Sequence, residues 1–379
     1  MAYIAKQLGV MSVIYASALN EINRRDNIMK LGRLLCAIAL FSGALFLSSR
    51  LLAAQDLSES TNNLKHLPRY KLIDLGTLGG PHSYGSVSGD GFRLLNNDGV
   101  VASYADTSRP DPHAPNFCFD ADCFLAHGFR WKDGDITDLG ALPGVNNSAA
   151  GSINERGWVA GSSQTGFVDP VLGPAIHGVL WKHHEIIDLG TFGAVSLGIY
   201  LNNAGQVVGI SDSTTPDPFS LFGRGVEIRT FVWEDGKLED IGTLGGPDSV
   251  PGAPCNNQRE SFVVGQSYTN FTPNPGTGIP TLAPFLWKRG RMIDLGSLGG
   301  TIGFAQCANN RGDIIGFSNL PGDLTQHAFL WDDGLMKDLG TLGGDSSEAI
   351  WINDAGEIAG SADLPGSVLH DAVEKWSDP

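Results

Sequence analysis

The sequence predicts an all-β protein, a six-bladed β-propeller of four-stranded blades closed by pairing of the N-terminal strand with the C-terminal blade. Three observations support this fold: one phrase recurs six times, each copy holds four short strand patterns, and the two ends of the chain carry complementary parts of one copy. The 50 glycines and 20 prolines among 379 residues favour short strands and tight turns over a helical bundle.

The recurring phrase is Asp-Leu-Gly, or Asp-Ile-Gly in one copy, and it defines the length of the repeat. Successive copies are separated by 64, 50, 52, 54 and 44 residues, which is close to a four-stranded blade with variable insertions. A tryptophan stands seven residues before five of the six copies, and an inner segment ending in asparagine, a glycine turn and a valine-rich run follow them. The copies begin at Asp74, Asp138, Asp188, Asp240, Asp294 and Asp338, and the tryptophans are Trp131, Trp181, Trp233, Trp287 and Trp331.

The ends of the repeat region predict that the blades form a ring. Residues 70 to 78 provide an Asp-Leu-Gly strand without its tryptophan, whereas the last copy ends at Trp376 without an Asp-Leu-Gly strand. Together the two parts make one complete blade. A ring protects its sheet edges through such pairing, and an open stack gains nothing from it.

The N-terminal residues have the outline of a secretory signal peptide. Basic residues up to Arg33 precede an apolar run over residues 34 to 47, and small residues around Ala53 and Ala54 follow. The run is shorter than the roughly 20 residues of a membrane span, so a retained anchor is the alternative. We expect cleavage near Ala54, with residues 1 to 54 as the signal, 55 to 69 as a linker, 70 to 379 as the propeller and no membrane span left. The signal is best proportioned from Met29, so residues 1 to 28 are a candidate for a misassigned start.

Export and charge restrict the partners. Without residues 1 to 54 the chain has 19 basic and 39 acidic residues, a net charge of −20, which repels nucleic acid and anionic membranes. We expect a monomer. Four cysteines remain in an oxidising compartment, and they suggest a local disulfide in a proline-rich loop and a second one between neighbouring blades. The predicted pairs are Cys118 with Cys123 and Cys255 with Cys307.

One copy of the repeat resembles a known family. The segment His-Ala-Phe-Leu-Trp at residues 327 to 331, followed by Asp-Leu-Gly-Thr-Leu-Gly-Gly at 338 to 344, is similar to the extracellular repeat family named for its His-Ala-Phe motif, the HAF repeat. The resemblance covers residues 70 to 376. It implies a secreted or cell-envelope bacterial protein and no particular activity. The histidine recurs in register at His127, His177 and His327, is replaced by Arg229 and Ala283 in two copies, and is out of register at His370.

The repeated polar residues are interpreted as structural. A histidine beside phenylalanine and tryptophan, and an aspartate present in every blade, fit hydrogen bonding better than a ring of metal-binding imidazoles or catalysis. The tryptophans fit a core between blades, with a sugar-stacking platform as the alternative. Asparagines three residues before a turn glycine fit turn hydrogen bonds. These asparagines are Asn96, Asn154, Asn202, Asn309 and Asn353.

The sequence contains no motif for a cofactor, and we expect none. The acidic pairs Asp120 with Asp122 and Asp133 with Asp135 lack the distal glutamate of a calcium loop, so calcium is not indicated and no metal site is predicted. The pair His183 and His184 lacks the spacing of a metalloprotease and is expected in an exposed turn. The chain also lacks the motifs of serine hydrolases, phosphate-binding loops, dinucleotide-binding folds and zinc fingers.

The long connections predict where a ligand binds. Residues 105 to 126, 163 to 176, 212 to 228 and 268 to 282 join second to third strands, and in an up-and-down blade they emerge on the same face as the connections between blades. Variable loops on a rigid scaffold commonly carry function, although tolerated insertions are the alternative. The predicted binding residues on this face are the lone carboxylates Asp106, Asp111, Asp217, Asp248 and Asp345.

We therefore expect a secreted, periplasmic or cell-envelope binding module without catalysis, whose partner is a glycan, a peptide or an envelope protein. One alternative is a propeller-type enzyme that acts on polysaccharide with paired carboxylates at the channel mouth. The other is a purely structural repeat protein. Singular acidic residues that converge on this face would favour the enzyme, and apolar or aromatic groups there would favour binding.

Overall fold

Each copy of the repeat forms an antiparallel sheet whose strands lie side by side in chain order. The computed structural model describes residues 71–85, 93–169, 173–253, 262–366 and 372–376, and these residues contain 23 strands in six sheets. Five sheets have four strands and the sixth has three. The predicted all-β fold of four-stranded units is thus confirmed. The predicted signal peptide and linker lie outside the described residues.

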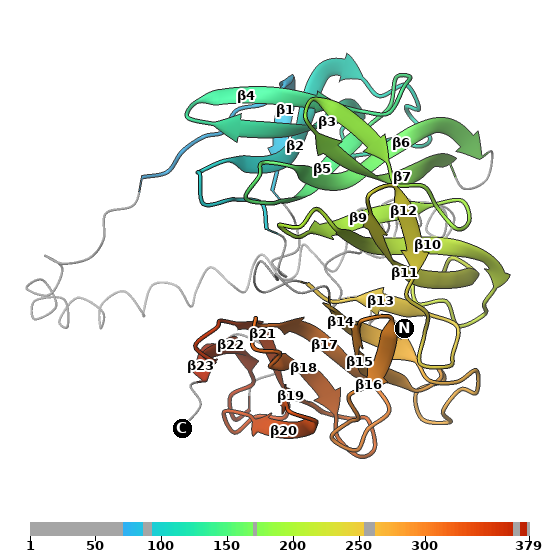
Figure 1. Ribbon diagram of the computed structural model, residues 1–379, viewed down its shortest axis with the longest axis vertical. Coiled ribbons are helices and arrows are strands. Elements are labelled where there is room, and N and C mark those ends of the chain that lie inside the picture. Colours follow the sequence, from blue (N-terminus) through green and yellow to red (C-terminus); the bar gives the residue numbers. More distant parts are fainter. Residues whose placement is uncertain (1–70, 86–92, 170–172, 254–261, 367–371, 377–379) are drawn as a thin grey trace, which may run out of the picture. The chain divides into compact units, whose positions relative to one another are not determined.

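The sheets are numbered here in chain order, as they follow one another in Figure 1. The first three sheets contain β1 (Gly79–Tyr84), β2 (Val101–Pro110), β3 (Phe124–Lys132) and β4 (Asp135–Gly140); β5 (Ser148–Ile153), β6 (Val159–Asp169), β7 (Gly173–Lys182) and β8 (Glu185–Asp188); and β9 (Ser196–Leu201), β10 (Val207–Pro216), β11 (Val226–Glu234) and β12 (Lys237–Asp240). The last three contain β13 (Ser249–Pro251), β14 (Phe262–Tyr268), β15 (Leu282–Lys288) and β16 (Arg291–Asp294); β17 (Gly303–Ala308), β18 (Ile314–Asn319), β19 (Gln326–Asp332) and β20 (Leu335–Gly340); and β21 (Ser347–Ile352), β22 (Ile358–Ala362) and β23 (Ala372–Trp376).

Two-residue turns join the third strand to the fourth in each complete sheet. Asp133 and Gly134 both have positive φ angles, 52° and 104°, as a twisted two-residue hairpin turn requires. In the second sheet the turn residues are His183 and His184, whose φ angles are 52° and 67°. Both histidines are exposed, so the predicted exposed turn at this position is confirmed.

A glycine recurs in the second strand because the first strand bends against it. At Gly161 an added Cβ atom would lie 2.1 Å from the carbonyl oxygen of Ala149, and at Gly316 it would lie 1.9 Å from that of Phe304. The pairing register of the first strand shifts beside both glycines, which marks a β-bulge. The glycine of the valine-rich run is therefore required by this close backbone approach.

The apolar core lies between successive sheets. Five clusters of buried side chains join the first sheet to the second and so on to the sixth. Trp181, Trp233 and Trp287 stand in the first three of these clusters and are 5 to 8% exposed. The interpretation of these tryptophans as core between sheets agrees with their position. Sheets stacked face to face along the chain are the arrangement of propeller blades.

The two ends of the repeat region are described separately. β1 pairs with β2 in the first sheet, and residues 71 to 77 have no strand assignment. β23 is an outer strand of the three-stranded sixth sheet. The described residues thus form six sheets, and closure of a ring through residues 70 to 78 stays a prediction. Within the described ranges, no helix has the length and hydropathy needed to cross a membrane.

Candidate functional site

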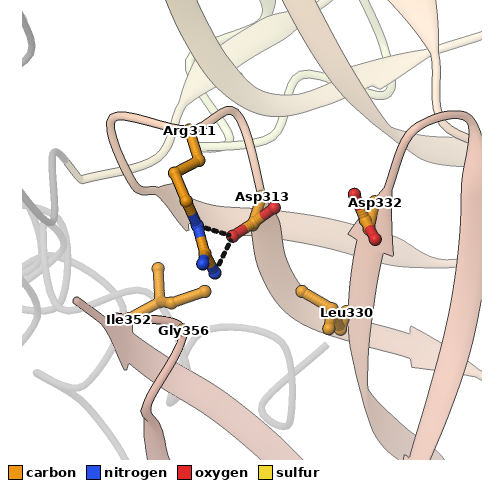
Figure 2. A pocket seen from close by; sticks show the side chains of 6 residues that line it. All are labelled: Arg311, Asp313, Leu330, Asp332, Ile352 and Gly356. Carbon is orange, nitrogen blue, oxygen red and sulfur yellow. Dashed lines mark hydrogen bonds and ion pairs between the residues drawn. The ribbon is translucent and has the colours of Figure 1, made fainter. Parts of the chain in front are cut away.

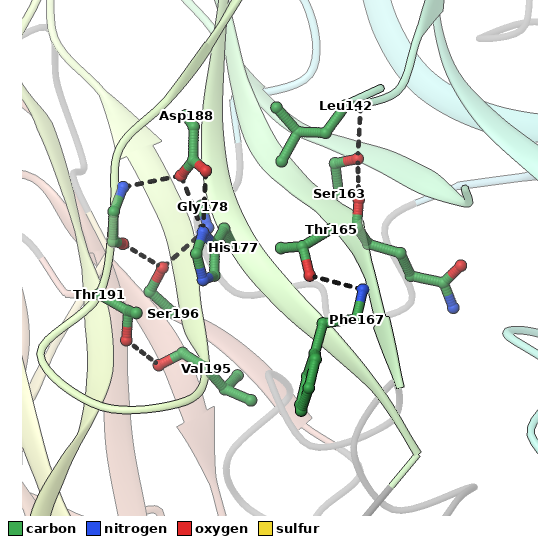
Figure 3. Close-up of polar contacts among 12 residues, drawn as sticks. Leu142, Ser163, Thr165, Phe167, His177, Gly178, Asp188, Thr191, Val195 and Ser196 are labelled. Carbon is green, nitrogen blue, oxygen red and sulfur yellow. Dashed lines mark hydrogen bonds and ion pairs between the residues drawn. The ribbon is translucent and has the colours of Figure 1, made fainter. Parts of the chain in front are cut away.

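The long connections gather at one end of the sheets, which we call the loop end, and the two-residue turns lie at the other, the turn end. Strands that alternate in direction place the connection between β2 and β3 and that between β4 and β5 at the same end. Hydrogen bonds tie the second strands to the connections between sheets. Ser163 Oγ accepts from the backbone N–H of Leu142 at 2.9 Å, as Figure 3 shows, and Ser211, Ser267 and Ser318 do the same in later sheets.

Three of the predicted binding carboxylates are buried and hold the loops. Asp111 accepts from the backbone N–H groups of His113 and Phe119 and from the side-chain amide of Asn147. Asp248 accepts from the backbone N–H groups of Ile228 and Leu221 at 2.8 and 2.7 Å. Asp217 is 2% exposed and accepts from the backbone N–H of Phe219. These hydrogen bonds hold the long connections of the first and third sheets.

The other two predicted carboxylates have different surroundings. Asp345 is exposed in the connection before β21. Asp106 lies on β2 and is fully buried, and its Oδ2 accepts from the backbone N–H of His82 at 2.9 Å. The charges of Asp217 and Asp248 interact between the third and fourth sheets, and Asp106 and Asp111 both interact with the charge of Asp120 in the first sheet.

Asp106 belongs to a group that we call the first-sheet cluster, which consists of His82, Asp106 and Asp122. One ligand atom from each residue lies within 4.8 Å of the others. His82 Nδ1 is 2.7 Å from Asp122 Oδ2 and 3.4 Å from Asp106 Oδ2. His82 comes from β1, Asp106 from β2 and Asp122 from the connection between β2 and β3. The cluster therefore lies at the loop end of the first sheet.

The surroundings of the cluster are aromatic and acidic. Tyr84 donates its hydroxyl hydrogen to Asp122 Oδ2 at 3.1 Å and stacks on Tyr104, with 4.8 Å between the ring centres. The Cys118–Cys123 disulfide closes the segment that carries Asp120 and Asp122. The predicted local disulfide is therefore present. Cys307 is also disulfide-bonded, and its predicted partner Cys255 lies outside the described residues.

The carboxylates of this region have displaced pKa values. Burial, together with the charges of Asp106, Asp122 and Asp111, raises the pKa of Asp120 to about 7. Burial and the neighbouring Asp122 raise the pKa of Asp106. Burial acts against ionisation of Asp122 as well, but hydrogen bonds from His82 and from the N–H of Phe124 lower its pKa overall. The hydrogen bond to Asp122 raises the pKa of His82. The carboxyl group of Asp106 is thus harder to ionise than an ordinary aspartate, and that of Asp122 is easier to ionise.

Such a group can bind a cation or exchange protons with a bound molecule. One imidazole and two carboxylates are ligands that divalent metal ions accept. The sequence identified Asp106 and the pair Asp120 and Asp122 but missed His82, because 24 and 40 residues separate it from Asp106 and Asp122. No local pattern marks that contact. Only the antiparallel pairing of β1 with β2 creates it.

The histidines of the repeated motif have a structural role. His127, His177 and His327 each contact the aspartate eleven residues later through Nδ1, at 2.9 to 3.0 Å. The aspartate Oδ1 also accepts the N–H of the glycine two residues further on, as Figure 3 shows for Asp188. Burial opposes ionisation of Asp138, but its hydrogen bonds with His127 and Gly140 lower the pKa of that carboxyl. These pairs therefore fix the third and fourth strands to each other.

A pocket of about 370 Å³ lies at the turn end, between the fifth and sixth sheets. It is lined by Arg311, Asp313, Leu330, Asp332, Ile352 and Gly356. Figure 2 shows that the Arg311 guanidinium is directed at the Asp313 carboxylate, with distances of 2.9 Å from Nε and 2.6 Å from Nη2. The charge of Arg311 is thus already compensated within the pocket.

Comparisons with known proteins add little beyond the fold. No protein-family model matches the chain, and no curated protein matches it. Among solved structures, the chain is similar to the β-propeller domain of the Trilobed protease from Pyrococcus furiosus, which is described as having an open Velcro topology. The two chains are 11% identical, the TM-score is 0.42, and the match covers 75% of this chain and 80% of that one. It is also similar to a puromycin hydrolase and to Trypanosoma rangeli sialidase, with identities of 13% and 10% and TM-scores of 0.39 and 0.33. The matches cover 72% and 79% of this chain, but only 43% and 58% of those two chains.

Proposed function

We propose that this chain is an exported, six-bladed β-propeller of the HAF-repeat type that binds an extracellular ligand at its loop end without catalysis. Two of its described features support export: the Cys118–Cys123 disulfide and the disulfide-bonded Cys307, since disulfides persist in oxidising compartments. The stacked four-stranded sheets and the five apolar clusters between them support the propeller. The ligand is a glycan, a peptide or another envelope protein.

The observation that supports binding best is the position of exposed apolar side chains at the loop end. Phe167, Phe271, Leu324 and Leu364 are 64, 60, 93 and 50% exposed. They stand on the second, fourth, fifth and sixth sheets, each at or after the end of the second strand. Single exposed apolar residues are ordinary, but four at corresponding positions of four sheets form a set of anchors for a ligand.

A binding experiment with a matched control tests this proposal. The exported protein is labelled and applied to a glycan array and to an immobilised peptide library. We expect the double variant Phe167→Ser and Phe271→Ser to lose at least about 10-fold in affinity for each bound probe, because interface aromatic groups dominate binding energies. The control is Leu335→Ser with Trp351→Ser, which removes exposed apolar groups, 61 and 42% exposed, outside the loop end. Loss of binding only in the control would show that the ligand binds elsewhere.

An enzyme acting on polysaccharide is the second candidate, and the displaced pKa values of Asp120 and Asp106 are the observation that favours it. Glycosidases use two carboxyl groups separated by about 5–5.5 Å or by about 6.5–9.5 Å. The oxygens of Asp106 and Asp122 lie within 4.8 Å of each other, which is closer than either spacing. Release of reducing sugar from a panel of polysaccharides, abolished by Asp120→Asn, would support the enzyme over the binding module.

A further inference from the structure

We propose that His82, Asp106 and Asp122 bind one divalent transition-metal ion, of the Zn²⁺ or Mn²⁺ class, at the loop end of the first sheet. His82 Nδ1 lies 2.7 Å from Asp122 Oδ2 and 3.4 Å from Asp106 Oδ2. Tetrahedral ligands at about 2.0–2.2 Å from zinc are separated by roughly 3.3–3.5 Å. The three side chains therefore need only small rotations to surround an ion. This inference is independent of the proposed ligand at the loop end.

The buried carboxylate of Asp106 points to a missing partner. Its Oδ2 accepts from the backbone N–H of His82, but Oδ1 is buried and has no hydrogen-bond partner among the described residues. The Asp106 side chain is 0% exposed, so water does not solvate this oxygen from the surface. Burial of a carboxylate whose oxygens lack hydrogen-bond partners costs free energy unless a positive charge lies beside it. A cation beside His82 and Asp122 supplies that charge.

Other acidic and histidine groups of the described chain lack this combination. Asp217 also has a buried oxygen without a partner, but its neighbours are carboxylates with no imidazole. His177 Nδ1 lies 2.9 Å from Asp188 Oδ2, but among the described residues no third acidic group completes a cluster with that pair. Within the described ranges the first-sheet cluster alone brings three such ligand atoms together. This makes His177 a suitable negative control.

The ligand types determine the class of metal. Calcium prefers six to eight oxygen ligands, whereas imidazole nitrogen favours zinc, iron, copper and nickel. One nitrogen and two carboxylate oxygens fit zinc or manganese, with remaining positions for water or for an oxygen of a bound molecule. His82 is 58% exposed, so an ion can reach the cluster from solvent.

The surrounding residues hold Asp122 in place. Tyr84 donates to Asp122 Oδ2 at 3.1 Å, and the N–H of Phe124 donates to Asp122 Oδ1 at 3.3 Å. The disulfide between Cys118 and Cys123 restrains the segment that carries Asp122. Such outer contacts orient metal ligands and commonly change metal affinity about 10–100-fold when they are removed.

Isothermal titration of the exported, tag-free protein after chelator treatment tests the proposal, with ZnCl₂, MnCl₂ and CaCl₂ as the probes. We expect one saturable zinc site per chain, weaker manganese binding in line with the usual order of metal affinities, and calcium binding at least about 100-fold weaker than zinc. His82→Asn and Asp106→Asn should each weaken zinc binding at least about 100-fold, and Tyr84→Phe about 10–100-fold. His177→Asn and Asp345→Asn, the controls for a histidine–aspartate pair and for surface charge, should bind zinc like the unaltered chain.

Melting temperatures of all variants separate loss of the site from loss of the fold. His82 is exposed on β1, so the His82→Asn variant should have nearly the melting temperature of the unaltered chain. This variant keeps the test valid if the Asp106→Asn variant unfolds. The proposal is overturned if zinc binding is absent, if it persists in folded His82→Asn, or if calcium binds equally well. Each of these results would show at most general attraction of cations to an acidic surface.

Discussion

His177 Nδ1 lies 2.9 Å from both carboxylate oxygens of Asp188, the aspartate eleven residues later in the chain (Figure 3). This contact links the two most recognisable phrases of the repeat, since His177 begins a His-Ala-Phe-like segment on β7 and Asp188 begins an Asp-Leu-Gly segment at the end of β8. The two-residue turn between β7 and β8 sets the register that brings them together. The spacing of the motif is therefore a consequence of hairpin geometry.

The His177–Asp188 pair should contribute a measurable coupling energy. A double-mutant cycle of His177→Ala and Asp188→Ala should give about 0.5–1 kcal/mol, because the pair is partly exposed and the hydrogen bond is charge-assisted only when the histidine is protonated. Urea unfolding of the four proteins measures it. Asp240→Ala is the control, since Asp240 accepts the N–H of Gly242 in the same way, but Arg229 replaces the histidine and is ion-paired with Glu227. A coupling energy of zero would show that the contact between the two side chains does not stabilise the fold.

Asn154 should stabilise the stack of sheets more than Asn202 does. Asn154 Oδ1 accepts from two backbone N–H groups of its own turn, and its Nδ2 donates to the carbonyl oxygen of Asn202 in the next sheet at 3.1 Å. Asn202 Nδ2 donates to Gln206 within its own turn. Asn154→Asp keeps the turn acceptor but removes the donor between sheets, so we expect a loss of about 1–3 kcal/mol.

The matched variant Asn202→Asp should lose less, because the bond that it removes, from Asn202 Nδ2 to Gln206 Oε1, lies within one turn and does not join two sheets. Both free energies of unfolding come from urea titration at one pH. Equal losses at the two positions would contradict a stabilising bond between sheets.

Asp248 should make the protein more stable in mild acid than in mild base. Burial, opposed by two backbone hydrogen bonds, raises its pKa to about 7, so the folded state holds a proton that the unfolded state releases near pH 4. The contribution of this group to stability is complete below its unfolded pKa and is lost as pH rises through about 7. Between pH 5 and pH 8 the loss should be on the order of 2 kcal/mol.

Asp248→Asn should remove this pH dependence, and Asn147 already occupies the corresponding position before the first strand of the second sheet. Unfolding at pH 5 and pH 8 measures the effect, with exposed Asp345→Asn as the control. If the pH dependence of Asp248→Asn matched that of the unaltered chain, the carboxyl would have to be ionised throughout.

Closure of the propeller can be tested because β1 begins only at Gly79. Deletion of residues 70 to 78 leaves every strand of the first sheet intact but removes the segment predicted to complete the three-stranded sixth sheet. We expect the melting temperature of the cooperative transition to fall by several degrees. A loss of about 1 kcal/mol or more in the free energy of unfolding produces such a fall in proteins of this size. Deletion of residues 55 to 69, the predicted linker, is the control. An unchanged melting temperature after removal of 70 to 78 would favour an open stack of sheets.

The repeat itself could be identified from the sequence. Strand number, the turn at His183 and His184, the core tryptophans and the Cys118–Cys123 disulfide all follow from periodicity, turn chemistry or short separations. Each depends on residues close in the chain or on a pattern repeated many times. Residues with the same role in every copy are therefore predicted well, since local geometry restricts them in the same way each time.

Tertiary structure alone decided the roles of the singular residues. Asp106, Asp111, Asp217 and Asp248 form one class in the sequence, yet three of them accept backbone hydrogen bonds within the loops and Asp106 faces His82. The contact of His82 with Asp122 spans 40 residues, and the Asn154 bond to the next sheet spans 48. The physical reason is that burial and hydrogen-bond partners depend on which strands and sheets pack together. The sequence determined the repeating unit, and the packing of strands determined which aspartates stabilise the loops and which one faces a potential ion.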